Sequence, residues 1–179
     1  MLPRIEMPQN IEIKCRLTSL AEAHRIAEEV SGGPAELIEQ VDIFYHSQGG
    51  RLKLRVFGEE SGELIFYRRP DQAGPKLSNY SIFPTDSPAS LDRVLAPALG
   101  VRGTVKKRRW LYRVGQTRIH LDEVEGLGCF LEFEVVLAES QDPDEGREIA
   151  NQLIGRFGLS LDRLVEQAYI DLLYPDDGG

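Results

Sequence analysis

The sequence predicts an α+β fold in which a closed antiparallel β-barrel of eight strands is flanked by helices. Three observations support this prediction. About eight segments alternate apolar and polar residues with a period of two, which is typical of strands. The polar face of most of these strands carries long charged side chains, and four helical segments must cover the apolar faces. The charged faces then point away from the helices and meet inside a closed barrel.

The length of 179 residues fits one domain over 1–179, with a barrel core at about 9–138 and C-terminal helices at about 143–173. The composition, 41% hydrophobic and 28% charged, is that of a globular protein. The net charge of −8 argues against a nucleic-acid partner. Residues 139–179 are acidic, whereas 1–138 hold 18 of the 21 bases, so the basic region could build a local anion site.

The sequence shows none of the patterns that are typical of membrane-spanning or secreted proteins. No apolar run approaches the length of roughly 20 residues that spans a bilayer. Residues 1–15 show no apolar core of a signal peptide, and two cysteines make no disulfide framework. We therefore expect a cytoplasmic protein, monomeric or homodimeric, with no membrane partner.

The N-terminal third is predicted as a strand, a helix and a hairpin. In strand 10–17 the apolar residues face one side and Glu12, Lys14 and Arg16 the other. A helix follows from Thr18 or Ser19, because Ser19 and Glu22 have capping-box spacing, and 32–33 end it with two glycines. Strands 40–46 and 51–56 flank a polar, glycine-ended turn and should form a hairpin.

The middle of the chain is predicted as two strands and a short helix. Strand 63–69 places Leu64 and Phe66 on one face, and after loop 70–75 strand 76–83 follows. Ser87-Pro88 then begins a helix that ends near Gly100, since proline suits the first helical position.

Three strands and two helices complete the prediction. The alternation in strand 105–113 is obscured by the four consecutive bases at 106–109, whereas strands 117–123 and 129–137 alternate clearly. Helices at about 143–157 and 161–173 show apolar residues at spacings of three and four.

The charged strand faces have two interpretations. On any single strand they are consistent with an exposed sheet surface. In a barrel, bases that converge repel unless a polyanion lies between them, and converging carboxylates repel unless a cation does. A triphosphate with a divalent metal satisfies both requirements.

Several motifs together resemble the CYTH superfamily of triphosphate tunnel metalloenzymes, over about residues 9–173. The hallmark Glu-x-Glu-x-Lys matches at Glu12 and Lys14, but Asn10 replaces its first Glu. The other matching stretches are 40–45, 50–55, 105–112, 122–134 and 168–173. The family includes class IV adenylate cyclases, thiamine triphosphatases and inorganic triphosphatases. Residues 50–55 and 64–80 most resemble the cyclase branch.

The resemblance implies a site. Glu132 and Glu134, two apart on one strand, project to the same side and with Glu12 would hold Mg²⁺ or Mn²⁺. Bases would hold the phosphates, because the planar guanidinium bonds them bidentately. The expected substrate-binding residues are Lys14, Arg51, Lys53, Arg55, Arg69, Lys76, Ser78, Lys107, Arg109 and Arg118. Catalytic roles are expected for Lys14, Arg109 and Asp122, the last as a ligand or as the partner of a lumen base.

Three functions remain open. The first is metal-dependent conversion of ATP to cyclic AMP and pyrophosphate, as in class IV cyclases. The second is hydrolysis of tripolyphosphate, thiamine triphosphate or a nucleoside triphosphate. The third is non-catalytic binding of polyphosphate or nucleotide. Asn10 bears on the choice, because losing one carboxylate should weaken a second metal site.

The histidines and cysteines indicate no other catalytic site. We expect His24 and His46 at the surface, His120 near the lumen, and both cysteines as buried thiols on apolar strand faces. No Ser-His-Asp or Cys-His signature, P-loop or dinucleotide fingerprint is present.

Overall fold

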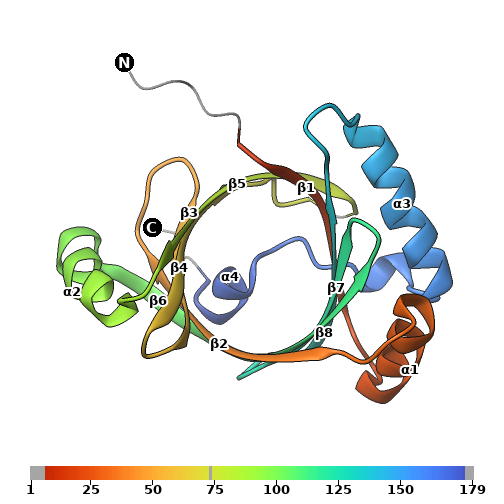
Figure 1. Ribbon diagram of the computed structural model, residues 1–179, viewed down its shortest axis with the longest axis horizontal. Coiled ribbons are helices and arrows are strands. Elements are labelled where there is room, and N and C mark those ends of the chain that lie inside the picture. The colour runs from red at the N-terminus through yellow and green to blue at the C-terminus, as the bar shows by residue number, and fades with distance from the viewer. Residues whose placement is uncertain (1–6, 73, 176–179) are drawn as a thin grey trace.

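The strands close into a barrel with the order β1-β5-β4-β3-β2-β6-β7-β8, and every neighbouring pair is antiparallel (Figure 1). The computed structural model describes residues 7–72 and 74–175. The expectations above that concern residues 1–6 and 176–179 lie outside these ranges. The predicted eight-stranded antiparallel barrel is confirmed.

The strands agree with the sequence pattern apart from their ends. They are β1 (Gln9–Arg16), β2 (Glu36–Tyr45), β3 (Arg51–Gly58), β4 (Ser61–Arg68), β5 (Lys76–Thr85), β6 (Val101–Val114), β7 (Thr117–Val124) and β8 (Gly128–Val136). β2 and β6 extend beyond their predicted ranges because they pair with each other from Glu36↔Leu111 to Tyr45↔Val101. Backbone hydrogen bonding in this long ladder outweighs the weak local alternation.

Three helices lie where the sequence predicted them, outside the barrel. α1 (Leu20–Ser31) begins at Ser19, whose hydroxyl accepts the Glu22 amide, and ends at Gly32 in the left-handed region, with φ 72°. α2 (Pro88–Leu99) has proline in its first turn, and α3 (Pro143–Arg156) is capped by Asp142. α1 and α3 flank β1, β6, β7 and β8, while α2 lies beside β2, β3 and β4.

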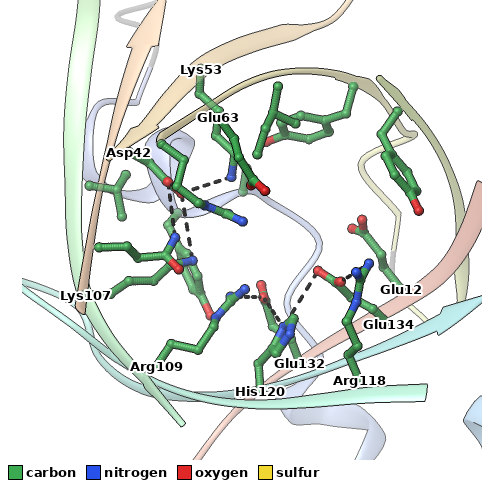
Figure 2. Close-up of a pocket in the computed structure, with 18 of the residues that line it drawn as sticks. Glu12, Asp42, Lys53, Glu63, Lys107, Arg109, Arg118, His120, Glu132 and Glu134 are labelled. Atoms are coloured by element: carbon green, nitrogen blue, oxygen red, sulfur yellow. Dashed lines mark hydrogen bonds and ion pairs between the residues drawn. The ribbon is translucent and has the colours of Figure 1, made fainter. Parts of the chain in front are cut away.

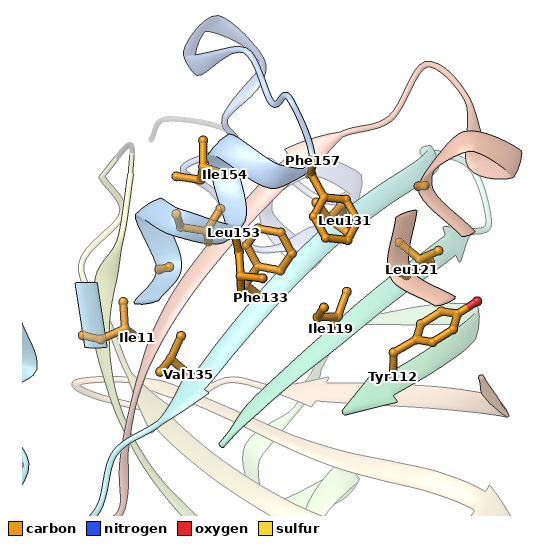
Figure 3. Close-up of a cluster of buried hydrophobic side chains, with 14 residues drawn as sticks. Ile11, Tyr112, Ile119, Leu121, Leu131, Phe133, Val135, Leu153, Ile154 and Phe157 are labelled. Atoms are coloured by element: carbon orange, nitrogen blue, oxygen red, sulfur yellow. The ribbon is translucent and has the colours of Figure 1, made fainter. Parts of the chain in front are cut away.

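The main core lies between the barrel wall and helices α1 and α3, not inside the barrel (Figure 3). Ile11 of β1 and Phe133 of β8 are fully buried there, and the Phe133 ring meets Phe157 with centroids 5.2 Å apart. α3 approaches so closely that a Cβ at Gly146 would lie 2.6 Å from Leu137 and 2.8 Å from Ile11. Because the apolar faces are covered from outside, the charged faces point inward, as predicted.

The prediction of a final helix over 161–173 is wrong for residues 161–168. Leu161–Arg163 is a short 3-10 turn, Leu164 bridges Cys15 of β1, and only α4 (Tyr169–Leu173) is helical. The Val165 amide donates to the Lys14 carbonyl at 2.9 Å, so this backbone pairs with a strand instead of with itself. We call residues 164–173 the closing segment, since it crosses one end of the barrel (Figure 1).

The histidines and cysteines outside the lumen differ in their burial. His24 is half-buried and not at the surface, because its Nδ1 lies 2.7 Å from the Tyr112 hydroxyl, whereas His46 is exposed. Cys15 is a buried thiol as expected, and Cys129 is only half-buried. Within 7–72 and 74–175, no helix has the length and apolar character needed to cross a bilayer.

Candidate functional site

The barrel encloses a cavity of about 270 Å³ that all eight strands line (Figure 2). Ala168 and Tyr169 of the closing segment also line it. Among the described lining residues, eight are basic and five are acidic, so the walls carry an excess of three positive charges when histidine is neutral. The chain as a whole has a net charge of −8. An acidic protein therefore concentrates positive charge around an internal cavity, which favours an anionic ligand.

Asp42 organises the bases on one side of the lumen. It lies on β2 between β3 and β6, and its carboxylate accepts from Lys53 at 2.9 Å and from Arg55 at 2.9 Å. Lys107 lies 4.0 Å away, and the Gln40 amide donates at 3.1 Å. Burial alone would raise the pKa of Asp42, but Arg55, Lys53 and Lys107 hold it well below its usual value. Asp42 therefore remains a fixed anion that holds three cations together.

Asp122 lies behind the lumen wall and holds a second set of side chains in position. Its side chain is fully buried and does not line the cavity. Both carboxylate oxygens accept from Arg109 at 2.6 Å, Lys107 lies 3.4 Å away, and the Tyr169 hydroxyl donates at 3.1 Å. Against burial, which opposes ionisation, Arg109 and Lys107 lower the pKa of Asp122 to about 2. Of the two roles expected for Asp122, the geometry favours the partner of lumen bases.

Three glutamates form the acidic side of the lumen. Glu12 of β1 is the direct register partner of Glu134 of β8, and Lys14 is that of Glu132. Glu12 therefore lies beside Glu134 on the neighbouring strand, and not across the lumen from it. Burial raises the pKa of Glu12, and the nearby Glu134 and Glu132 add to the rise, while Arg69 opposes it.

Each of these glutamates has a basic partner. Glu134 lies 2.9 Å from Arg118, and Glu132 lies 2.8 Å from Arg109 (Figure 2). Glu132 also contacts Lys14 at 3.2 Å, and Glu12 lies 3.2 Å from Arg69. The convergence of like charges that the strand faces suggested is therefore only partial, because each of these glutamates pairs with a base. These pairs compensate part of the charge on the barrel wall and leave the excess of basic groups over acidic ones.

The acidic side also fits a metal ion. One ligand atom each from His120, Glu132 and Glu134 lie within 4.8 Å of one another. His120 Nδ1 is buried and has no hydrogen-bond partner among the described residues, and it lies 3.8 Å from Glu132 and 3.7 Å from Glu134. Burial and Arg109 lower the pKa of His120, which keeps the imidazole neutral and able to ligate. Carboxylates with one imidazole suit Mg²⁺ or, better, Mn²⁺.

Two residues expected to bind substrate lie outside the cavity. Arg51 pairs with Asp71 at 2.6 Å and with Asp171 of the closing segment at 2.7 Å. The Lys76 ammonium donates to main-chain carbonyls, including Glu166 at 2.8 Å and Val165 at 3.3 Å. Both side chains therefore hold the closing segment. The other expected substrate-binding residues line the lumen: Lys14, Lys53, Arg55, Arg69, Ser78, Lys107, Arg109 and Arg118.

Sequence reasoning missed several polar residues that line the cavity. Asp42 and Gln40 share the alternating face of their strand, and Glu63 shares the face of Arg69, so period-two counting could have found them. His120 as a metal ligand had the same signal, because it alternates with Arg118 and Asp122. Tyr169 had none, since it reaches the lumen only through the fold of the closing segment.

A closed barrel with a charged lumen of this kind defines a triphosphate tunnel protein. The sequence model of the CYTH domain matches residues 8–169, so the chain belongs to the CYTH family. Members of this family bind triphosphate substrates and depend on a metal ion. The resemblance of the motifs to the CYTH superfamily is therefore confirmed.

Relatives agree with this assignment along nearly their whole length. A protein of Methanocaldococcus jannaschii named "Putative adenylate cyclase" is 24% identical, covering 90% of this chain and 97% of its own. A solved structure from Pyrococcus horikoshii has 25% identity and a TM-score of 0.80, covering 91% of this chain and 98% of its own. One from Pyrococcus furiosus shares the fold at 20% identity, with a TM-score of 0.79 and coverage of 91% and 99%.

Proposed function

We propose that this protein binds a nucleoside triphosphate with a divalent metal inside the barrel and converts ATP to cyclic AMP and pyrophosphate. The observation that carries the proposal is the lumen itself, where an excess of basic groups faces a cluster of two glutamates and a neutral histidine. Such a lumen suits a polyanion and a cation together. The cyclase name of the M. jannaschii relative supports the finer assignment.

Binding would proceed by exchange of ion-pair partners. Lys14 and Arg109 hold Glu132, and Arg118 holds Glu134, through contacts of 3.2, 2.8 and 2.9 Å. Phosphate oxygens would replace these carboxylates as partners of the bases, since guanidinium groups bond phosphate bidentately. The released carboxylates would then be available for a cation. The exchange is complete only when both bind, because the triphosphate takes the bases and the metal takes the carboxylates that they release.

The chain's own residues would assist the reaction by positioning and by charge. In the proposed step the ribose 3′-hydroxyl loses its proton and its oxygen bonds to the α-phosphorus, while the bond from that phosphorus to pyrophosphate breaks; water or the leaving pyrophosphate takes up the proton. Arg55, Lys107 and Arg109 would stabilise negative charge that develops on the leaving pyrophosphate. Glu132, Glu134 and His120, with Glu12 beside them, would hold Mg²⁺ or Mn²⁺, which supplies Lewis-acid neutralisation of the phosphoryl oxygens when bound.

One observation favours a second candidate function. Asn10 occupies the position of the family's first glutamate, so the lumen offers one carboxylate fewer for a second metal. If the reaction needs two metals, this loss would lower or alter turnover. A triphosphatase that splits off orthophosphate, or a binding module without turnover, would use the same charged lumen.

A product analysis separates these functions. The pure protein is incubated with ATP, tripolyphosphate or thiamine triphosphate and Mg²⁺ or Mn²⁺, and the products are identified by mass. Cyclic AMP with pyrophosphate from ATP is expected. Orthophosphate would identify a triphosphatase, and binding without product would identify a binding module. Failure to bind any of the three triphosphates would contradict the proposal altogether.

A further inference from the structure

Two neutral polar side chains in the lumen, one on β1 and one on β5, each have an oxygen that no group in 7–72 or 74–175 satisfies. Asn10 of β1 and Ser78 of β5 are register partners that both line the cavity, with exposed fractions of 3% and 1%. Among the described residues, Asn10 Oδ1 and Ser78 Oγ have no hydrogen-bond partner. Buried polar atoms are nearly always paired in native proteins, so two adjacent exceptions facing a cavity point to a ligand.

The adjacent outward-facing pair behaves differently. Gln9 and Asn79 are the next register partners on the same two strands, and the Gln9 amide donates to Asn79 Oδ1 at 2.8 Å. These strands can therefore pair polar side chains across the ladder. The inward pair is left unpaired on the face where a substrate would lie.

The position of the pair within the barrel selects a part of the substrate. Along β1 the lumen residues run from Lys14, beside the closing segment, to Glu12 and then to Asn10. Asn10 and Ser78 thus lie beyond the acidic side, in the direction away from the closing segment. Tyr80 and Ile82, the next lining residues along β5, continue in that direction and offer apolar surface. A triphosphate bound among the bases would extend its organic group toward this end.

The chemistry of the two atoms selects a hydroxyl over a phosphate. An amide oxygen only accepts hydrogen bonds, and an ionised phosphate oxygen cannot donate one. A hydroxyl can donate to Asn10 Oδ1 and accept from the Ser78 hydroxyl at once. We propose that Asn10 and Ser78 bind a sugar hydroxyl and make the lumen specific for nucleoside triphosphates over inorganic tripolyphosphate. The proposal rests on the triphosphate-binding function above.

Calorimetry without metal tests this pair. ATP, 2′,3′-dideoxy-ATP and tripolyphosphate are titrated into the wild-type protein, Asn10→Ala and Ser78→Ala. We expect wild type to bind ATP about tenfold more tightly than its dideoxy analogue, the usual effect of one hydrogen bond to an otherwise unpaired group. Each variant should lose that difference and bind tripolyphosphate as wild type does. Ser78→Thr retains the hydroxyl and should retain discrimination, and Asn79→Ala on the outer face is the matched control.

Other outcomes overturn the inference in distinguishable ways. An equal loss of affinity for tripolyphosphate would make the pair part of the phosphate site. A loss of Mn²⁺ affinity in Asn10→Ala would make Asn10 a metal ligand. If wild type binds ATP and its dideoxy analogue equally, the triphosphate function stands and the sugar pair fails. If it binds none of the three anions, both proposals fail.

Discussion

Lys53 is a lumen base whose charge is sensitive to pH near neutrality. Burial, and then the neighbouring Arg55, lower its pKa to about 7, although Asp42 opposes the shift. A bound phosphate would favour the charged ammonium, so binding above this pKa requires uptake of a proton. Lys53 therefore couples anion affinity to pH in a range where arginines remain charged.

Metal-free tripolyphosphate affinity should consequently be full below pH of about 7 and fall above it. The fall attributable to Lys53 is at most about tenfold per pH unit, because one proton is linked to binding. Calorimetry at several pH values measures it. Lys53→Arg should remove the step near 7 while affinity persists, and an unchanged profile in that variant would refute the assignment to Lys53.

Glu132 and Glu134 should both be needed for metal-dependent turnover. Replacing both by Gln keeps their size but removes two carboxylates from the proposed metal group. Metal-dependent turnover should fall by at least about a hundredfold, the range lost when transition-state charge stabilisation is removed. Metal-free triphosphate binding should persist or tighten, because Lys14, Arg109 and Arg118 lose their competing partners.

A matched control is available on the outer face of β7. Glu123 is exposed and pairs with Arg108 at 3.4 Å, so Glu123→Gln should leave both measurements unchanged. Turnover and Mn²⁺ affinity that survive in the double variant would show that the metal assignment is wrong.

Among the secondary-structure elements, the closing segment covers one end of the barrel (Figure 1). Its Tyr169 lies at the floor of the cavity, with the Lys14 ammonium 4.0 Å and the Lys107 ammonium 4.9 Å from the ring centroid. Lys14 also donates to the Gln167 carbonyl at 3.1 Å. The segment thus positions lumen bases as well as covering one end.

Asp171 fixes this segment to the barrel. Its carboxylate accepts from Arg51 of β3 and Arg102 of β6, each at 2.7 Å, and from the Ala168 amide at 3.2 Å. Asp171→Ala should lower the free energy of unfolding by about 2–3 kcal/mol, since these are charge-assisted and partly buried hydrogen bonds. Urea unfolding measures the change.

The control for Asp171 is an ion pair without burial. Glu29 pairs with Arg25 on the exposed face of α1 at 3.3 Å. Glu29→Ala should change stability by less than about 0.5 kcal/mol, as expected for a surface helical pair. If the two variants unfold alike, the closing segment is not held by Asp171.

At the scale of the whole molecule, the charge distribution predicts ligand-linked stability. An acidic chain encloses a lumen with an excess of three positive charges, so a bound polyanion should stabilise the native state selectively. Tripolyphosphate at a hundredfold excess over its Kd should add about 2.7 kcal/mol of stability by mass action. Monophosphate, which cannot contact bases on several strands at once, should barely raise the Tm.

Thermal melts in each anion measure this difference. Arg55→Ala removes a lumen base and should reduce the shift caused by tripolyphosphate. Replacing the exposed Arg113, which pairs with Glu36 near the open end, should have a smaller effect. Equal Tm shifts from tripolyphosphate and monophosphate would indicate general salt effects instead of a lumen site.

Local sequence patterns were enough to predict the strands apart from their ends, the first three helices and the charged face of most strands. These features follow from local periodicity and capping, as at Ser19 and Gly32, where neighbours in the chain decide the structure. Where four bases run together at 106–109, periodicity failed, and only the resemblance selected Lys107 and Arg109 as the inward pair, which the structure bears out.

The pairing of the charges and the closing of the barrel could not be predicted from local patterns. The strand order β1–β8 places Glu12 beside Glu134, and β2 between β3 and β6 makes Asp42 the common partner of their bases. The helical pattern at 161–173 gave way because Lys14 and Lys76, distant in sequence, take the segment's carbonyls. Contacts between residues far apart in the chain have no local periodicity to reveal them, so only the closed barrel could bring these groups together.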